Sequence, residues 1–177
     1  SITLGALAAM TEGAAPGSTS RISEDPGLSA DRAFRPAQPT FASGVHLCAV
    51  EVDAETGVVT IQHYAIVHDC GVVVNPLIVE GQTQGALAHG IGNALFEEIA
   101  YDEQGQLLTG TFMDYLLPAA SDVPAARLGH VVTPTPVNPQ GVKGAGEGGT
   151  IPAPAAILAA VSDALSQLGA RVTALPL

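Results

Sequence analysis

The chain has 177 residues, and its six basic against seventeen acidic residues give a net charge of −11 at pH 7. Since nucleic acids and anionic membrane surfaces are bound through basic patches, this charge argues against both as partners. Hydrophobic residues make up 47% of the chain, which is enough for a globular core, and no apolar run reaches the length of a membrane span.

The two cysteines, Cys48 and Cys70, form no CxxC pair. Neither a zinc site nor an iron–sulfur cluster can be built from this chain alone, so we expect no metal-ligating residues. Cysteines used in this way are typical of a reducing compartment, which predicts a cytoplasmic location.

The first forty residues differ in composition from the rest. Residues 1–11 are expected to form a short helix, and residues 12–40 are rich in Gly, Pro and Ser with little periodicity, as in a connector. Position 1 is not a methionine, and we expect the chain to be part of a longer or split subunit. The sequence thus predicts a connector region over 1–40 and an α+β domain over 41–177.

Alternation of apolar and polar residues predicts two strands, 45–53 and 58–69, joined by AETG with Gly57 at the turn. A helix is expected next, since Asn75 before Pro76 is typical of an N-cap followed by proline at the first helical position. Helical spacing continues from there to about Ala100.

Glycines are unusually frequent in this expected helix, at positions 81, 85, 90 and 92. Each costs about 1 kcal/mol relative to alanine in a helix interior, so each needs a reason. One reason is close packing against a sheet or another helix. The other is a helix backbone that faces a flat cofactor, with Gln82 or Gln84 supplying an amide to it. The sequence leaves both open.

Four more strands are expected, in residues 101–110, 112–118, 126–136 and 170–177. A last helix is introduced by Thr150 and Pro152 and ends near Gly169. The predicted fold is therefore α+β, a mixed sheet with hairpins packed against two long helices, and part of a larger cofactor-binding subunit.

Glu147 is the strongest candidate for chemistry, because it lies among glycines directly before the last helix, at 144, 146, 148 and 149. Glycine lets the backbone approach a bound group closely, and the free N–H groups of a helix start favour anions. A carboxylate in such a loop therefore needs a separate role. Burial there would raise the pKa of Glu147 and make it a usable base.

Other patterns have simpler explanations. GAGEGG matches a dinucleotide-binding fingerprint, but the preceding PTPVNPQGVK is too rich in proline for a buried strand. His68, Asp69 and Cys70 suggest a metal or nucleophile cluster, yet adjacent strand residues point to opposite faces, and a turn-forming aspartate explains the pattern better. The remaining histidines show no ligand spacing and are expected at the surface or packed, namely His46, His63, His89 and His130.

Three stretches carry a family resemblance: VHDCGVVVNPLIVEGQTQGALAHGIGNALFEE, GTFMDYLLPAASDVP and NPQGVKGAGEGGTI. They resemble, in unbroken order, the C-terminal part of the molybdopterin-binding large subunit of the xanthine dehydrogenase family, which includes aerobic carbon monoxide dehydrogenase large chains. Large subunits of this family are several times longer, so the resemblance covers only their last portion.

The resemblance implies a role for each site residue. It implies that Glu147, in the KGxGE segment, is the catalytic base, and that Gln82 places its amide beside the cofactor. The loop that lines the pterin is implied to be Lys143, Gly144, Ala145 and Gly146. The implied cofactor is molybdenum on molybdopterin, in bacteria commonly the cytosine dinucleotide form, with no side chain as metal ligand and with water as the source of oxygen.

The resemblance also implies partners: the remainder of the molybdopterin subunit, an iron–sulfur small subunit and an FAD medium subunit that take up electrons. A small-molecule substrate is implied, and carbon monoxide, purines, aldehydes and N-heterocycles all stay open. The alternative function is a non-catalytic isolated domain or an assembly module of the same fold, which never holds cofactor.

Overall fold

A computed structural model describes residues 33–177 of the chain. The chain divides into two compact units, Ser1–Ala37 and Gln38–Leu177, and every helix and strand described below lies in the second. The helix expected over residues 1–11 and most of the expected connector lie outside the described residues. No helix in the described part is both long and apolar enough to cross a membrane.

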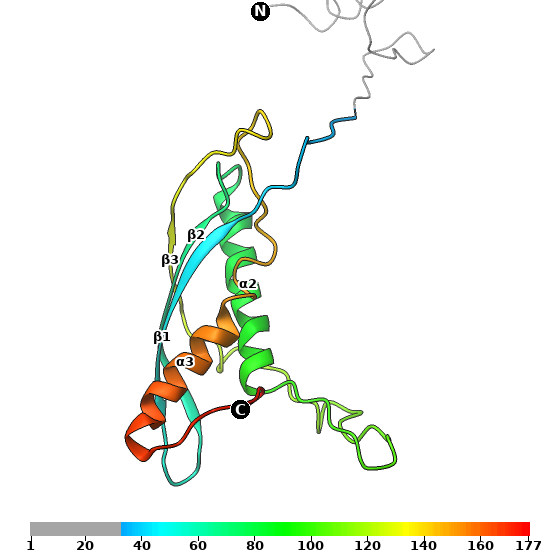
Figure 1. The fold of residues 1–177 in the computed structure, drawn as a ribbon, viewed down its shortest axis with the longest axis vertical. Coiled ribbons are helices and arrows are strands. Elements are labelled where there is room, and N and C mark those ends of the chain that lie inside the picture. Colours follow the sequence, from blue (N-terminus) through cyan, green and yellow to red (C-terminus); the bar gives the residue numbers. More distant parts are fainter. Residues whose placement is uncertain (1–32) are drawn as a thin grey trace, which may run out of the picture. The chain divides into compact units, whose positions relative to one another are not determined.

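The sheet has three strands in the order β1 (Ser43–Val52), β2 (Val59–Asp69) and β3 (Arg127–His130). β1 and β2 pair antiparallel, whereas β2 and β3 pair parallel, so the sheet is mixed as expected (Figure 1). The turn between β1 and β2 contains Gly57 at φ 76°, a left-handed conformation that favours glycine.

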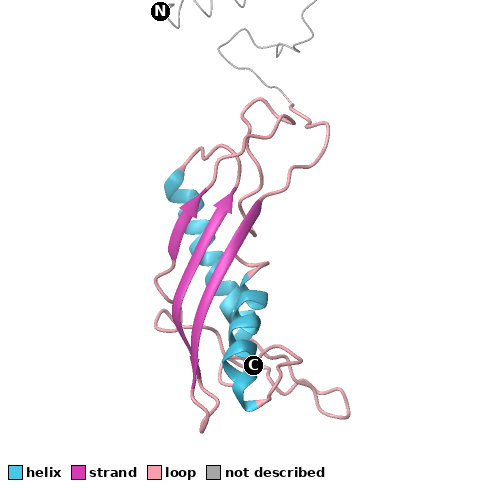
Figure 2. Cartoon of the chain, turned by 60° about the vertical axis from the view of Figure 1, so that its left-hand side comes forward, coloured by secondary structure: helices cyan, strands magenta, loops and turns pink. Residues whose placement is uncertain are grey.

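Two helices cover one face of this sheet (Figure 2). α2 (Pro76–Leu95) has twenty residues, and the Asn75 side chain caps it by accepting a hydrogen bond from the amide of Ile78 at 3.3 Å. α3 (Ala153–Leu165) has thirteen residues and continues into the short 3-10 helix η1 (Ser166–Leu168). The N-cap and the end near Gly169 agree with the sequence-based expectation.

Three of the expected strands are absent from the described residues, namely those over 101–110, 112–118 and 170–177. Side-chain hydrogen bonds hold the first two segments in turns instead: the carboxylate of Asp102 accepts from the amides of Gln104 and Gln106, and the hydroxyl of Thr111 bonds to Asp114. The prediction of more than one hairpin is therefore wrong, since the described residues contain one antiparallel strand pair.

The sequence-based prediction also placed the end of α2 too far along the chain. The helix stops at Leu95 rather than near Ala100. The amides of Phe96 and Glu97 both donate to the carbonyl of Gly92, and the backbone then leaves the helical path. A turn rather than a further turn of helix therefore follows Leu95.

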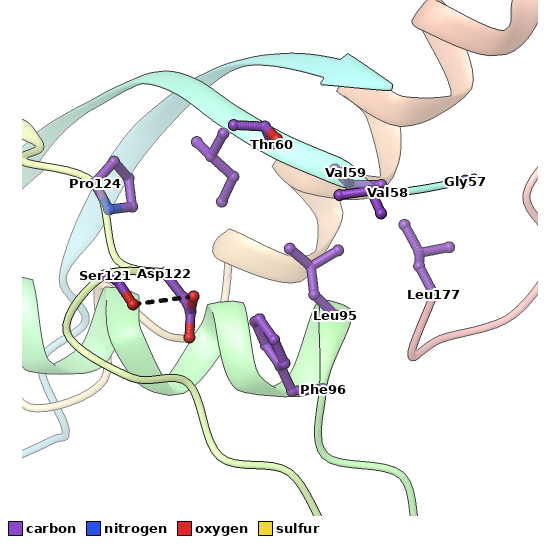
Figure 3. A pocket seen from close by; sticks show the side chains of 11 residues that line it. Gly57, Val58, Val59, Thr60, Leu95, Phe96, Ser121, Asp122, Pro124 and Leu177 are labelled. Carbon is purple, nitrogen blue, oxygen red and sulfur yellow. Dashed lines mark hydrogen bonds between the residues drawn. The ribbon is translucent and has the colours of Figure 1, made fainter. Parts of the chain in front are cut away.

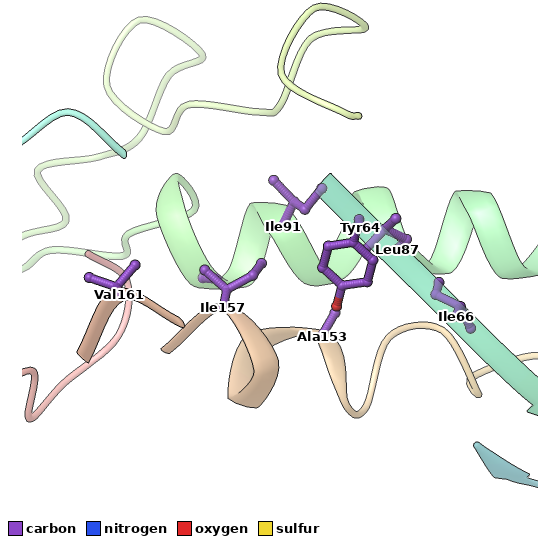
Figure 4. Close-up of a cluster of buried hydrophobic side chains, with 8 residues drawn as sticks. Tyr64, Ile66, Leu87, Ile91, Ala153, Ile157 and Val161 are labelled. Atoms are coloured by element: carbon purple, nitrogen blue, oxygen red, sulfur yellow. The ribbon is translucent and has the colours of Figure 1, made fainter. Parts of the chain in front are cut away.

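The core lies between the sheet and the two helices (Figure 4). It contains eight buried residues: Tyr64, Ile66, Leu87, Ile91, Ala94, Ala153, Ile157 and Val161. They come from β2, α2 and α3, so burial of one apolar face of each element holds the three together. The opposite face of the sheet stays exposed, with Val45 at 60% and Leu47 at 67% of full exposure.

Candidate functional site

A cavity of about 330 Å³ lies between α2 and the loop that precedes α3. Its lining consists of Gln82, Gly85, Ala86, His89, Gly146, Glu147, Thr150 and Ile151. The α2 residues follow one another at helical spacing along a single face. An amide, an imidazole, a hydroxyl and a carboxylate thus surround one space, although they come from segments far apart in the sequence.

The loop is fixed on α2 by close packing. Gly149 is buried, and a methyl group in place of its hydrogen would lie 2.6 Å from the carbonyl oxygen of Thr83 and 2.8 Å from Cβ of Ala86. Next to it, the Thr150 hydroxyl donates to the Ala86 carbonyl at 3.0 Å. Only glycine permits this approach, so the position of Glu147 over the cavity depends on its neighbours.

The glycines of this loop therefore divide into two kinds. Gly148 and Gly149 pack closely, the first against the ring of His68 and the second against α2. A methyl group at Gly144 or Gly146 would meet nothing within 4 Å. The first pair positions the loop, whereas the second pair leaves its backbone open to a bound group.

The α2 glycines divide in the same way. Gly90 is packed against α3, since a methyl group there would lie 2.5 Å from Cβ of Ala153, and Gly92 is covered by the side chain of Glu97. Gly81 and Gly85 face open space, and Gly85 lines the cavity. Close packing, the first of the two explanations left open by the sequence, applies to Gly90 and Gly92. The second, a helix backbone that faces a cofactor, stays a prediction, and Gly85 is the helix glycine on the cavity to which it can apply.

Of the residues expected at the site, the cavity brings together Glu147, Gln82 and Gly146. Lys143 is placed differently, because its ammonium group forms an ion pair with Asp69 at 3.1 Å, with 14% and 9% of the two side chains exposed. Gly144 and Ala145 lie between these points and do not line the cavity.

Glu147 is exposed in the described part of the chain. The expectation of a buried carboxylate is therefore wrong for these residues taken alone. The reason is that the cavity is walled by two segments, α2 and the loop, and the described chain supplies no cover over it.

Asp69 is the residue whose importance the sequence did not show. Its carboxylate accepts from the amides of Gly71 at 2.8 Å and Thr133 at 3.2 Å as well as from Lys143. Hydrogen bonds from Thr133, from Gly71 and from Lys143 hold the pKa of this carboxyl well below its usual range. The expected turn residue is thus also the anchor of the Lys143 side chain.

His89 was expected to be an ordinary surface or packed histidine, yet it lines the cavity. Its position seven residues after Gln82 was the available signal, since residues at this spacing share a helix face. Among residues 33–177, no group of three or more His, Cys, Asp or Glu side chains is arranged to hold a metal ion.

A larger cavity of about 560 Å³ lies at the other end of the domain, between the β1–β2 turn, the end of α2 and Leu177 (Figure 3). Its one carboxylate, Asp122, is already occupied, since it accepts from the amide of Ala119 at 2.7 Å and from the Ser121 hydroxyl at 3.4 Å. Among the described residues, this cavity is lined mostly by apolar side chains and does not contain the residues expected at the site.

Comparison with known proteins identifies the family. Residues 2–124, more than half of the chain, match the molybdopterin cofactor-binding domain family. The chain is 45% identical to the nicotine 6-hydroxylase large subunit of Paenarthrobacter nicotinovorans over 86% of its own length and 19% of that protein. It is 38% identical to the carbon monoxide dehydrogenase large chain of Hydrogenophaga pseudoflava over 82% of its length and 18% of that protein.

Among solved structures, quinoline 2-oxidoreductase from Pseudomonas putida 86 matches with a TM-score of 0.82 and 42% identity, over 94% of this chain and 21% of that one. The chain belongs to the molybdopterin cofactor-binding domain family, and the resemblance read from its motifs is confirmed. It spans about a fifth of the length of the relatives it matches.

The residues present fit a cofactor of this kind. Gly85 on α2 and Gly146 on the loop line the cavity from opposite elements, and neither meets another atom within 4 Å where a side chain would begin. The exposed amide of Gln82, three residues before Gly85 on α2, lines the same cavity. Bare backbone on two walls and an amide donor suit a flat, polar group.

Proposed function

We propose that this chain is a portion of a molybdenum hydroxylase large subunit, which oxidises a small substrate with water as the oxygen source. The observation that carries the proposal is the meeting of Glu147 and Gln82 on one cavity, from two elements that the fold brings together. The family membership of the chain supports the same conclusion.

The bound cofactor would supply the redox centre for a two-electron oxidation, chemistry that amino-acid side chains do not provide. The Gln82 amide would orient it by hydrogen bonding, and the open backbone at Gly144, Ala145 and Gly146 would border it. Lys143 would contribute through its backbone, because its ammonium group is held by Asp69.

Glu147 would act as the general base, taking a proton onto its carboxylate from the water-derived oxygen that is transferred to the substrate. Its present exposure fits this role once the remainder of the subunit covers the cavity and keeps out bulk water. His89 lies on the same cavity and is the second titratable group there.

N-heteroaromatic compounds are the substrate class we favour. The nicotine 6-hydroxylase and quinoline 2-oxidoreductase matches, at 45% and 42% identity, both act by name on such compounds. Carbon monoxide is the alternative, by analogy with the carbon monoxide dehydrogenase large chain at 38% identity. Purines and aldehydes follow as further candidates.

The proposed partners are the remainder of the subunit, an iron–sulfur small subunit and an FAD medium subunit that receive the electrons. The exposed apolar side chains of Val45 and Leu47 on the free face of the sheet support contact with further protein. The cytosine dinucleotide form of the cofactor, a cytoplasmic location and a division into 1–40 and 41–177 complete the proposal.

The test is Glu147→Gln in the complex purified with its partners, assayed with quinoline, nicotine and carbon monoxide. We expect molybdenum content to be unchanged and turnover to fall by about two to four orders of magnitude, since a lost general base costs about 10²–10⁴-fold. Glu103→Gln, an exposed glutamate away from the cavity, is the matched control and keeps the parent rate. An unchanged rate for Glu147→Gln refutes the proposal.

Elemental mass analysis of the same complex distinguishes the proposed hydroxylase from the alternative, non-catalytic function. A hydroxylase carries close to one molybdenum per chain, whereas a non-catalytic or assembly module carries none in a folded, fully assembled complex. The second result would leave Glu147 without a reaction to serve.

A further inference from the structure

The end of β2 contacts both ends of the loop that carries Glu147. At one end, the Lys143 ammonium group pairs with Asp69 and the Lys143 amide donates to the Cys70 carbonyl at 2.7 Å. At the other end, Gly148 packs on the His68 ring so tightly that a methyl group there would lie 2.7 Å from Cδ2. Two adjacent strand residues thus hold the start and the end of the loop.

These two contacts come from different faces of the strand. Successive strand residues project to opposite faces of a sheet, so His68 and Asp69 reach the loop from different sides. Asp69 is itself fixed by the amides of Gly71 and Thr133, and so provides a rigid attachment point. The carboxylate of Glu147, next to Gly148, thus lies in a segment held near both of its ends.

A packing or turn role alone does not account for these residues. His68 is 1% exposed and neither of its ring nitrogens has a hydrogen-bond partner among residues 33–177, which an apolar side chain of similar size would avoid. Burial lowers the pKa of His68, as does neighbouring His130, so the ring is uncharged against Gly148. For Asp69, a turn needs only the bond to Gly71, and the pairing with Lys143 is additional.

We propose that His68 and Asp69 are positioning residues that set where the Glu147 carboxylate lies over the cavity, His68 by supporting Gly148 and Asp69 by holding Lys143. The inference rests on the proposed function of Glu147. Neither side chain lines the cavity, so both act through the loop and not on the substrate.

The first test is a double-mutant cycle of Gly148→Ala and His68→Ala in the purified complex, with quinoline, nicotine and carbon monoxide as substrates. Gly148→Ala forces the loop off the imidazole, and we expect kcat to fall about 100-fold while KM and molybdenum content change less than about twofold, because a misplacement near 1 Å costs this much. Adding His68→Ala removes the obstacle and restores kcat at least about tenfold. If the kcat losses of the two single variants simply multiply in the double variant, the inference is overturned.

The second test does not depend on turnover. Asp69→Asn keeps the size of the side chain but removes the charge that holds Lys143. We expect amide hydrogen exchange in residues 143–148 of the complex to become at least about tenfold faster, as for a segment that has lost an anchor. Gly110→Ala is the matched control, since its methyl group would meet only Cδ2 of Leu107 at 3.8 Å, and its exchange stays unchanged. Parent-like exchange and kcat in Asp69→Asn overturn the inference, even if Gly148→Ala fails to fold.

Glu147→Gln in the same series separates the two proposals. If it abolishes turnover while Gly148→Ala and Asp69→Asn behave like the parent complex, only the positioning role fails. If Glu147→Gln retains the parent rate, the proposed function fails and the positioning role fails with it.

Discussion

Glycine-to-alanine substitution along α2 tests the two explanations for its glycines with one chemical change. At Gly90, a methyl group would lie 2.5 Å from Cβ of Ala153 and 3.2 Å from the carbonyl oxygen of Thr150. Neither atom belongs to a flexible side-chain end, so α2 and α3 must separate. At Gly81 the same methyl group meets nothing within 4 Å.

The magnitudes follow from this difference. Both substitutions gain about 1 kcal/mol of helix propensity, but Gly90→Ala also carries an overpacking cost of about 1–3 kcal/mol. The propensity gain cancels in the comparison, so the two variants should differ by about 2 kcal/mol. For a chain of this length that corresponds to about 4–8 °C in Tm.

The assay is thermal and urea unfolding of the purified chain, with Gly81→Ala as the matched control. Gly81→Ala should raise Tm by about 2–4 °C, and Gly90→Ala should lower it. If Gly90→Ala stabilises the chain as much as Gly81→Ala does, the close contact with α3 is not present and the explanation by packing is refuted.

Gly85→Ala separates stability from cofactor binding on the same helix. Its methyl group also meets nothing within 4 Å, so the unfolding free energy should rise by about 1 kcal/mol, as for Gly81→Ala. Gly85 lines the cavity, however, and the added group should lower the molybdenum content of the purified complex severalfold. Full molybdenum content in Gly85→Ala would show that the cofactor does not approach this wall.

Two further predictions concern titration. Asp69 has its pKa lowered by hydrogen bonds from Thr133, Gly71 and Lys143, so the stability it supplies is present above the unfolded-state pKa of about 3.9 and is lost as the pH falls below that value. The urea midpoint of the parent chain should therefore drop more steeply than that of Asp69→Asn between about pH 5 and pH 3, and parallel profiles would contradict this. Burial raises the pKa of the Cys48 thiol from 9.0 to about 11, which lowers its thiolate fraction at pH 8 about a hundredfold. In a Cys70→Ser background, iodoacetamide should react at least about tenfold faster in urea than with the folded chain, whereas equal rates would place this thiol outside the core.

The sequence predicted best those features that depend on neighbours in the chain. Asn75 before Pro76 marks the start of α2, and Gly57 marks the turn between β1 and β2, because backbone conformation and capping are decided within a few residues. The prediction of a strand over residues 101–110 was wrong, and the cause is again a local interaction. The Asp102 carboxylate captures two amides there, and these hydrogen bonds compete with strand pairing.

The candidate site was only partly predictable. The KGAGEGG motif predicted Glu147 as a candidate, and it lines the cavity; helical spacing from Gln82 would have added His89, since both rules are local. Which glycines are open and which are packed could not be predicted, because that depends on the atoms opposite them. Gly146 and Gly148 are two residues apart, yet one borders the cavity and the other rests on His68.

By itself, then, the sequence determined the family, the order of the main elements and the carboxylate on which the proposed chemistry depends. The tertiary structure alone decided how that carboxylate is held. Asp69 and Lys143 are 74 residues apart and become partners only when β2 and the loop before α3 meet. Packing of distant segments places side chains to within a few tenths of an ångström, and no rule of local spacing contains that information.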